Sequence, residues 1–298
     1  MKLTHVTPSQ VVPLARPARR WGAASLPALA LMLALCSAGP AAAQAREGVD
    51  VGKNSAFSNL VPADAVERSS AEQYQQMLQQ AHENKALAGK DHPQLLRLRA
   101  IAAKIIPHAL QWNPRAANWR WEVNLIGSKQ INAFCMPGGK IAFYTGILDQ
   151  LKLTDDEVAM VMGHEVAHAL REHARERMGK STATNIGASL LTQMLGLGQI
   201  GQTVTNYGAQ LLTLQFSRDN ESEADLVGME LAARAGYDPR AGVTLWQKMG
   251  AANKGAPPQW LSTHPAGGTR IADIEKNLPK VMPLYNKALL ARGTTPQR

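Results

Sequence analysis

The stretch from Gly163 to His168 combines the residue types and the spacing that could bind a metal ion. It reads H-E-x-x-H, with His164 and His168 four residues apart. On a helix these positions share one face, so both imidazoles can bind one Zn²⁺ ion and supply half of a tetrahedral site. Glu165 is close enough to reach a water on that metal without being a ligand. The pattern therefore predicts a general base beside a zinc site, an arrangement suited to hydrolysing a peptide bond.

The third protein ligand that a hydrolytic zinc site needs is predicted on a later helix. That helix begins after Ser217, and on it Glu221 and Asp225 share one face four residues apart. We expect Glu221 to be the third ligand, because small and apolar neighbours indicate a packed face: Ala224, Val227 and Gly228. Asp225 could accept a hydrogen bond from the far nitrogen of a ligand histidine and fix its tautomer.

Two other histidines have less support as members of the site. A different arrangement, the metzincin pattern, needs a Gly three and a His six residues after His168, but those positions hold Arg171 and Ala174. His173 lies five residues after His168, a rotation of about 140° on one continuous helix, so it is interpreted as a surface histidine. His264 is predicted to lie in a loop, where a structural role and a catalytic role both stay open.

The element that must hold the two histidines is a long helix. Thr154 and Glu157 form a capping box, in which each side chain accepts a backbone N–H of the other residue. Apolar residues then recur with a helical period, at Val158, Val161, Met162, Val166 and Ala169. Cationic residues in the later turns favour the helix dipole, and Gly179 is the predicted stop. The histidine pair should therefore lie in mid-helix, where the backbone fixes its geometry.

A small antiparallel sheet is predicted just before that helix. Residues 119–125 alternate between apolar and polar side chains, which indicates a half-buried strand. Residues 131–136 and 140–145 give a second and a third strand, joined by the turn Pro137-Gly138-Gly139. An edge strand there could bind an extended peptide through backbone hydrogen bonds. A plain scaffold sheet is the alternative interpretation.

Further helices are predicted on both sides of these elements. A capping box at Ser69–Glu72 starts one, and Pro93 starts another that ends near Pro107. Asp238-Pro239 opens a third. The uncharged stretch 185–216 allows a lid, a buried helical hairpin or a membrane contact, and its polar residues favour a lid or hairpin over a bilayer span. The fold class is therefore α+β and mostly α.

The first 43 residues are typical of a secretory signal peptide. One lysine and three arginines precede an apolar run, and small residues follow up to Ala43, where cleavage is expected (Ala45 is the alternative). A lipoprotein site at Cys36 is disfavoured, because Leu35 is too large for the position before the cleaved bond. We therefore expect the protein in the periplasm, with peripheral membrane association left open.

Composition limits the remaining classes. The chain has 298 residues, of which 45% are hydrophobic, enough for one large domain or two small ones. The signal region carries four of the 32 basic residues and none of the 23 acidic ones, which leaves a net charge of +5 on the remainder. Its basic residues are scattered, so no nucleic-acid partner is expected. Without Cys36 only Cys135 remains, so no internal disulfide is expected.

Four motifs together resemble the M48 family of zinc metallopeptidases. In chain order they are Asn132-Ala133-Phe134 ahead of Pro137-Gly138-Gly139, His164-Glu165-x-x-His168, Glu221-x-x-x-Asp225, and Ser262-Thr263-His264-Pro265 with Arg270. The likeness spans roughly residues 65–280 and is strongest to exported bacterial members of the Oma1-like and periplasmic type. It implies a zincin-like (gluzincin) fold with one Zn²⁺ per chain, held by His164, His168 and Glu221, and Glu165 as base. It also implies a substrate-facing strand at Gly138–Thr145. His264 would act near the metal, either stabilising the oxyanion or filling the open site at rest.

The whole chain can then be divided as follows: a signal peptide (1–43), a linker (44–68), a metallopeptidase domain (69–282) and a C-terminal tail (283–298). The predicted function is a zinc-dependent endopeptidase of the cell envelope for protein quality control. Its expected substrates are unfolded or misfolded envelope proteins, and the oligomeric state is left open. The alternative is a zinc-bound chaperone or binding protein with a latent or closed protease site. A structural envelope protein that kept the motif is a third class.

Overall fold

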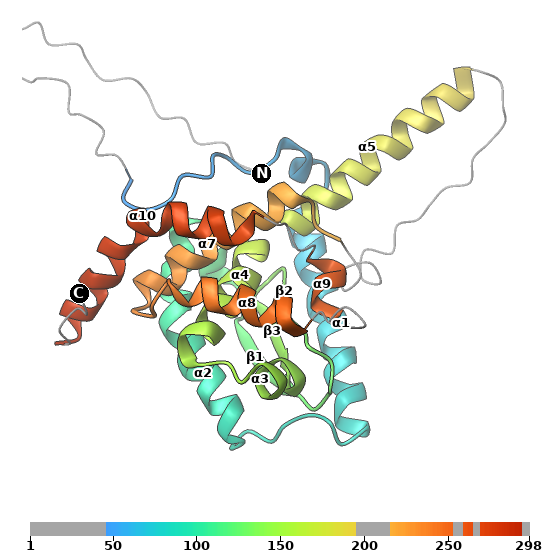
Figure 1. The fold of residues 1–298 in the computed structure, drawn as a ribbon. Helices are drawn as coiled ribbons and strands as arrows, with labels where there is room; N and C mark the ends of the chain where they lie inside the picture. Colours follow the sequence, from blue (N-terminus) through green and yellow to red (C-terminus); the bar gives the residue numbers. More distant parts are fainter. Residues whose placement is uncertain (1–45, 195–214, 253–258, 265–268, 294–298) are drawn as a thin grey trace, which may run out of the picture. The chain divides into compact units, whose positions relative to one another are not determined.

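Figure 1 shows the computed structural model, which describes residues 46–194, 215–252, 259–264 and 269–293. The expected signal peptide and residues 195–214 of the uncharged stretch lie outside the described residues. The helices are α1 (Ala63–Glu83), α2 (Pro93–Ile105), α3 (Thr145–Leu151), α4 (Asp155–Leu170), α5 (His173–Met194), α7 (Arg218–Arg234), α8 (Ala241–Ala252), α9 (Gln259–Thr263) and α10 (Arg270–Ala291). Short 3₁₀ helices are η1 (Ala56–Leu60), η2 (Ile106–Gln111) and η3 (Pro114–Asn118). The strands are β1 (Glu122–Ile126), β2 (Ala133–Met136) and β3 (Lys140–Tyr144). The fold is α+β and mostly helical, as predicted.

The helix that carries the H-E-x-x-H motif is α4. The predicted capping box is present: Thr154 Oγ1 accepts the N–H of Glu157 at 3.3 Å, and Glu157 Oε2 accepts the N–H of Thr154 at 2.9 Å. Every residue from Glu157 to Leu170 is buried. The histidine pair therefore lies inside the core on a helix whose first turn is fixed by its own side chains.

The predicted end of this helix is wrong. α4 stops at Leu170, Glu172 adopts a left-handed φ of 59°, and α5 begins one residue later. Gly179 lies inside α5 and ends nothing. Its missing side chain instead lets the backbone carbonyl of Phe57 approach the helix where a Cβ would collide. A glycine is needed here because the Phe57 backbone packs directly against the helix, and not because the chain turns.

The three-stranded sheet is mixed, whereas the sequence suggested an antiparallel one. Its order is β1-β3-β2, with β3 antiparallel to β2 and parallel to β1. The predicted turn joins β2 to β3, and its residues Gly138 and Gly139 have φ of 85° and 79°, a region that glycine enters without strain. β2 pairs through this turn with one side of β3, so β1 can only pair with the other side. β3 is therefore the central strand and β2 lies at an edge.

The N-terminal part of the fold begins earlier than predicted. α1 starts at Ala63, so the expected cap at Ser69 is wrong, and Ser70 lies inside the helix, donating its hydroxyl to Val66 O at 2.7 Å. Within the segment expected to be a linker, Val49, Val61 and Val66 are buried. Residues 46–68 therefore contribute to the core.

The C-terminal helix also extends the fold beyond the predicted boundary. α10 runs to Ala291, past Pro279 and Pro283, and buries Leu284, Tyr285 and Leu289. The expected tail thus starts too early, because these apolar residues continue the helix period of α10.

In the core, α4 packs against α7, β2, α2 and α8. α4 and α7 cross where two glycines face each other: a Cβ built on Gly163 would lie 2.5 Å from Gly228 O. The helices can come this close only because neither residue has a side chain at the crossing. The crossing lies next to His164, and it brings the polar face of α7 to the H-E-x-x-H motif.

None of the helices in the described part of the chain is long and apolar enough to cross a bilayer.

Candidate metal centre and active site

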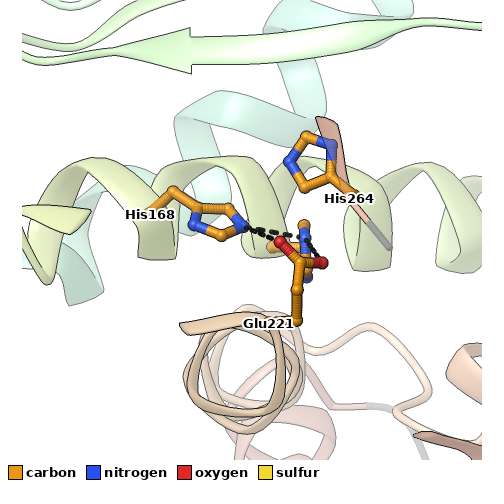
Figure 2. A group of neighbouring side chains, drawn as sticks. His168, Glu221 and His264 are labelled. Carbon is orange, nitrogen blue, oxygen red and sulfur yellow. Dashed lines mark hydrogen bonds and ion pairs between the residues drawn. The ribbon is translucent and has the colours of Figure 1, made fainter. Parts of the chain in front are cut away.

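The side chains predicted as metal ligands meet at one buried point between α4 and α7. Nε2 of His164 and Nε2 of His168 are 3.0 Å apart. Glu221 Oε2 lies 3.6 Å from His164 Nε2, and Glu221 Oε1 lies 3.4 Å from His168 Nε2. A fourth donor joins them, because ligand atoms of these three residues and of His264 all lie within 4.8 Å of one another. Figure 2 shows His168, Glu221 and His264 turned toward each other.

This group fits a tetrahedral zinc ion. Ligand atoms at roughly 2.0–2.2 Å from one Zn²⁺ ion are about 3.3–3.6 Å apart in a tetrahedron. The separations of His164, His168 and Glu221 are close to that range. Among the described residues, Glu221 Oε1 and His264 Nε2 are buried without any hydrogen-bond partner. A buried carboxylate oxygen beside unprotonated imidazole nitrogens is the donor set that Zn²⁺ binds.

Burial keeps the three histidines in the neutral form that can bind a metal. It lowers the pKa of His164 to about 4, although the hydrogen bond with Asp225 raises it. It lowers the pKa of His168 and His264 well below 6.5, and the neighbouring histidines add to the effect. A neutral imidazole presents an unprotonated nitrogen, which is the form required of a ligand.

Asp225 and Arg270 surround the outer side of His164. Asp225 Oδ1 lies 3.0 Å from His164 Nδ1, as predicted for a carboxylate that fixes the tautomer. Arg270 donates to Asp225 Oδ2 at 2.6 Å, to Asp225 Oδ1 at 2.5 Å and to Glu221 Oε2 at 2.7 Å. With Nδ1 engaged by Asp225, Nε2 of His164 is the nitrogen that faces the candidate ligands.

Glu165, the predicted general base, is held by a residue that the sequence analysis did not identify. Trp260 Nε1–H donates to Glu165 Oε1 at 2.6 Å, and Trp260 is only 1% exposed. Glu165 Oε2 lies 3.6 Å from His264 Nε2. The indole stacks on the His264 ring, with centroids 4.8 Å apart and an interplanar angle of 21°. Burial raises the pKa of Glu165 well above 4.5, although the Trp260 hydrogen bond lowers it.

His173 is not a surface histidine. It is 1% exposed, and its Nδ1 lies 2.8 Å from Nδ1 of His168. The interpretation failed because it assumed one continuous helix. The break at Arg171 and Glu172 turns the chain, so His173 starts a new helix and points back at His168. Because no signal in the sequence showed that the helix ends before His173, the angle between His168 and His173 could not be derived from helix geometry.

A pocket opens beside the candidate ligands. It is lined by the edge strand and its flanks (residues 132–137), by Glu165, His168 and His264, and by apolar or small side chains of the elements around them: Ala169, Ala174 and Phe216. Within the described residues, β2, which contributes to this lining, has one edge without a strand partner, whereas β3 is paired on both sides. The implied substrate-facing strand at Gly138–Thr145 is therefore wrong, and the edge available beside the site belongs to β2.

The profile of Peptidase family M48 matches residues 94–278, which include the whole α4–α7 site. The chain belongs to peptidase family M48. Over 225 residues it is 32% identical to the mitochondrial metalloendopeptidase OMA1 of Schizosaccharomyces pombe, covering 74% of this chain and 64% of the relative. Over 150 residues it is 42% identical to the mitochondrial metalloendopeptidase OMA1 of Arabidopsis thaliana, covering 50% and 30%. Over 197 residues it is 30% identical to the beta-barrel assembly-enhancing protease of Escherichia coli, covering 63% and 39%.

The M48 match confirms the family resemblance, and the named relatives are metalloendopeptidases or a protease. The matched segments cover between 30% and 64% of the length of these three relatives. What each whole relative does is therefore not transferred to this chain by the match alone.

All six residues predicted for the site are brought together in this M48 chain: His164, Glu165, His168, Glu221, Asp225 and His264. Their individual roles stay predictions. Trp260 and His173 were missed as contacts of the site. No motif spacing distinguished them in the sequence.

Proposed function

We propose that this M48 chain is a zinc-dependent endopeptidase that cleaves unfolded or damaged proteins of the cell envelope, as part of protein quality control. One observation carries the proposal: two imidazoles from α4 and one carboxylate from α7 converge on a single buried point. His164, His168 and Glu221 would hold one Zn²⁺ ion per chain. Asp225 would orient the ring of His164 from behind.

Glu165 is the proton carrier in this proposal. The ion, when bound, would polarise the scissile carbonyl and lower the pKa of the attacking water. Glu165 accepts the proton of that water and delivers it to the leaving amine. Because Trp260 donates to Oε1, Oε2 is the oxygen left for this transfer. A carboxyl with a raised pKa suits both halves of the task, since it must gain and then release a proton near neutral pH.

The edge of β2 supports an extended polypeptide as substrate. An extended peptide can add to the edge of β2 that has no partner among the described residues, and so lie along the pocket that Glu165 and His264 border. Only an unfolded or flexible segment can adopt this conformation over several residues. Folded domains would be excluded, which is why we assign unfolded and misfolded proteins as the substrate class.

The cellular location is inferred from the N-terminal sequence. Its charged start, apolar run and small residues up to Ala43 support export to the periplasm. Similarity to a protein named for the assembly of β-barrels agrees with a role in the envelope.

The first test combines metal analysis with digestion of an unfolded protein such as casein. We expect about one zinc per chain, in line with a single three-ligand site, and cleavage that a chelator stops. E165Q should keep its zinc but lower kcat by about 10²- to 10⁴-fold, because the proton transfer is lost. E72Q, at an exposed position on α1, is the matched control. Undiminished turnover in E165Q would reject Glu165 as the base.

A second candidate function is a zinc-bound chaperone with a closed protease site. The position of His264 favours it, since its Nε2 lies within the ligand group and could fill the fourth position. H264A separates the two functions. As an active peptidase, the wild type should digest casein, and H264A should change the rate without releasing zinc. If only H264A digests casein, the wild-type site is closed at rest.

A further inference from the structure

The contact between His168 and His173 is an imidazole pair that the proposed reaction does not use. Their Nδ1 atoms are 2.8 Å apart, and both residues are at most 3% exposed. The ring centroids are 4.9 Å apart at 74°, so the rings meet edge to edge and do not stack. Such a short contact between two buried nitrogens requires one proton between them, because two unprotonated nitrogens would repel and two protonated ones would clash.

The position of that proton follows from the candidate metal site. Nε2 of His168 faces His164 Nε2 and Glu221, so as a ligand it carries no proton. The proton of a neutral His168 is then on Nδ1, from which it is donated to His173 Nδ1. His173 is left with its own proton on Nε2. That atom lies 3.4 Å from Glu223 Oε2 and makes no hydrogen bond within the described residues, so a carboxylate lies near the far end of the pair without accepting its proton.

Glu223 is held in turn by Arg171. The guanidinium donates through Nε to Glu223 Oε1, and through Nη2 to the backbone carbonyl of Gly52 at 3.0 Å. Arg171 is 6% exposed, so this ion pair is largely shielded from water. The chain of contacts therefore runs from the ligand nitrogen of His168 through His173 and Glu223 to a buried arginine.

The other ligand histidine has the same kind of support with one residue fewer. His164 contacts Asp225 directly, and Asp225 is paired with Arg270. In both cases a carboxylate from α7 and an arginine stand behind a histidine of α4. On the His168 side an imidazole lies between the ligand histidine and the carboxylate. Carboxylate partners of this kind orient a ligand histidine and fix which nitrogen is free.

We propose that His173 is a positioning residue for His168: its Nδ1 accepts the Nδ1 proton of His168, and this hydrogen bond holds the His168 ring with its Nε2 free for the metal. The inference rests on the proposed metal site and extends it. An alternative is that His173 only fills space, together with Phe216, whose ring stacks on His168 with the ring centroids 4.0 Å apart. The two ideas differ in whether an acceptor atom is needed at position 173.

Two substitutions at this position separate the roles. H173F keeps a planar ring but removes the acceptor, whereas H173Q keeps an acceptor oxygen and a donor N–H. We expect H173F to weaken zinc binding by about 10- to 100-fold, as is usual for the loss of an outer partner of a ligand. H173Q should recover most of the affinity. H82F and H82Q, at an exposed position on α1, serve as controls and should bind as the wild type does.

Affinity is measured on the purified full-length protein by competition for zinc with a chromophoric chelator. Equal affinity of H173F and the wild type would overturn the proposal, and so would equal weakening in H173F and H173Q. A wild type that binds no zinc would instead reject the metal site and the proposed function. The two failures are therefore distinguishable.

A measurement on the zinc-loaded wild type does not depend on whether the variants fold. Two-dimensional ¹H–¹⁵N spectra of the imidazole rings report which nitrogen carries the proton. We expect His173 to be protonated at Nε2 and unprotonated at Nδ1, and His168 to be protonated at Nδ1. The opposite tautomer of His173 would remove the acceptor and overturn the proposal.

Discussion

Two turns of α7 carry carboxylates whose surroundings differ sharply. Glu221 and Asp225 are one turn apart, are both buried and both contact Arg270. Asp225 receives two hydrogen bonds from Arg270 and one contact from the His164 ring. Glu221 receives one hydrogen bond from Arg270, and its Oε1 has no hydrogen-bond partner in the described part of the chain. Arg270 therefore compensates the charge of Asp225 more fully than that of Glu221.

The pKa values of the two groups follow this difference. Burial raises the pKa of both carboxyls, but Arg270 and His164 outweigh it at Asp225 and lower its pKa to about 2. At Glu221 burial prevails and raises the pKa to about 8. The charge of Asp225 is thus compensated by the protein itself. Glu221 needs a further cation, and we interpret the first turn of α7 as built for a metal and the second as built for a histidine.

The largest effect that tests this contrast is expected at Glu221. E221Q removes the only anionic candidate ligand from the group. Losing a residue that only supports a ligand lowers metal affinity by up to about 100-fold, and E221Q should lower zinc affinity by more than this. Competition with a chromophoric chelator measures the change. D219N, at an exposed position on the same helix, is the control and should have no effect. If E221Q bound zinc as the wild type does, the assignment of Glu221 as a ligand would be wrong.

A smaller loss of zinc affinity is expected at Asp225, together with a larger loss of stability. D225N keeps the metal ligands but weakens the support of His164, so zinc affinity should fall by about 10- to 100-fold. It also leaves the buried Arg270 without its main partner, which should lower the free energy of unfolding by about 3–5 kcal/mol. Zinc competition and urea unfolding in excess chelator measure the two effects separately. A D225N protein with weaker zinc binding than E221Q would reverse the roles of the two turns.

The same two helices show what could be predicted from the sequence. α4 and α7 start at capping boxes, so the first residue of each helix depends on residues within one turn: Thr154 with Glu157, and Ser217 with Asn220. The i, i+4 spacing of His164 with His168 and of Glu221 with Asp225 then fixes which side chains share a face. Local chemistry therefore predicted the candidate ligands before any long-range contact was known.

One missed feature is local, and the others depend on contacts between distant residues. α4 ends without a glycine, because Glu172 takes the left-handed conformation and pairs with Arg175, so the usual signal is absent. The parallel pairing of β1 with β3 depends on which strand edge the hairpin leaves open. Trp260 reaches Glu165 from 95 positions away in sequence. No local pattern in one sequence contains the strand pairing or the Trp260–Glu165 contact.

Glu157, about two turns before His164 on α4, gives the smallest predicted effect and a reference for the contrast on α7. Like Asp225, it is compensated by the protein: it accepts from Thr244 at 2.8 Å, from Lys248 at 2.6 Å and from the N–H of Thr154 at 2.9 Å. Burial alone would raise its pKa, but these hydrogen bonds outweigh burial and lower the pKa below 4.5. A lowered folded pKa stabilises the fold above the unfolded value, and this contribution is lost as the pH falls through the folded pKa.

E157Q should therefore be less stable than the wild type at pH 7, by about 1–3 kcal/mol, because buried hydrogen bonds to a charged group are lost. The difference should narrow as the pH falls below 4.5 and through the lowered pKa of Glu157, where this carboxyl of the wild type becomes protonated itself. Urea unfolding at a series of pH values, in excess chelator, measures it without a contribution from zinc. A difference that stays constant with pH would mean that E157Q acts through packing or capping, and that the charge of this carboxylate is not compensated in the way that we infer for Asp225.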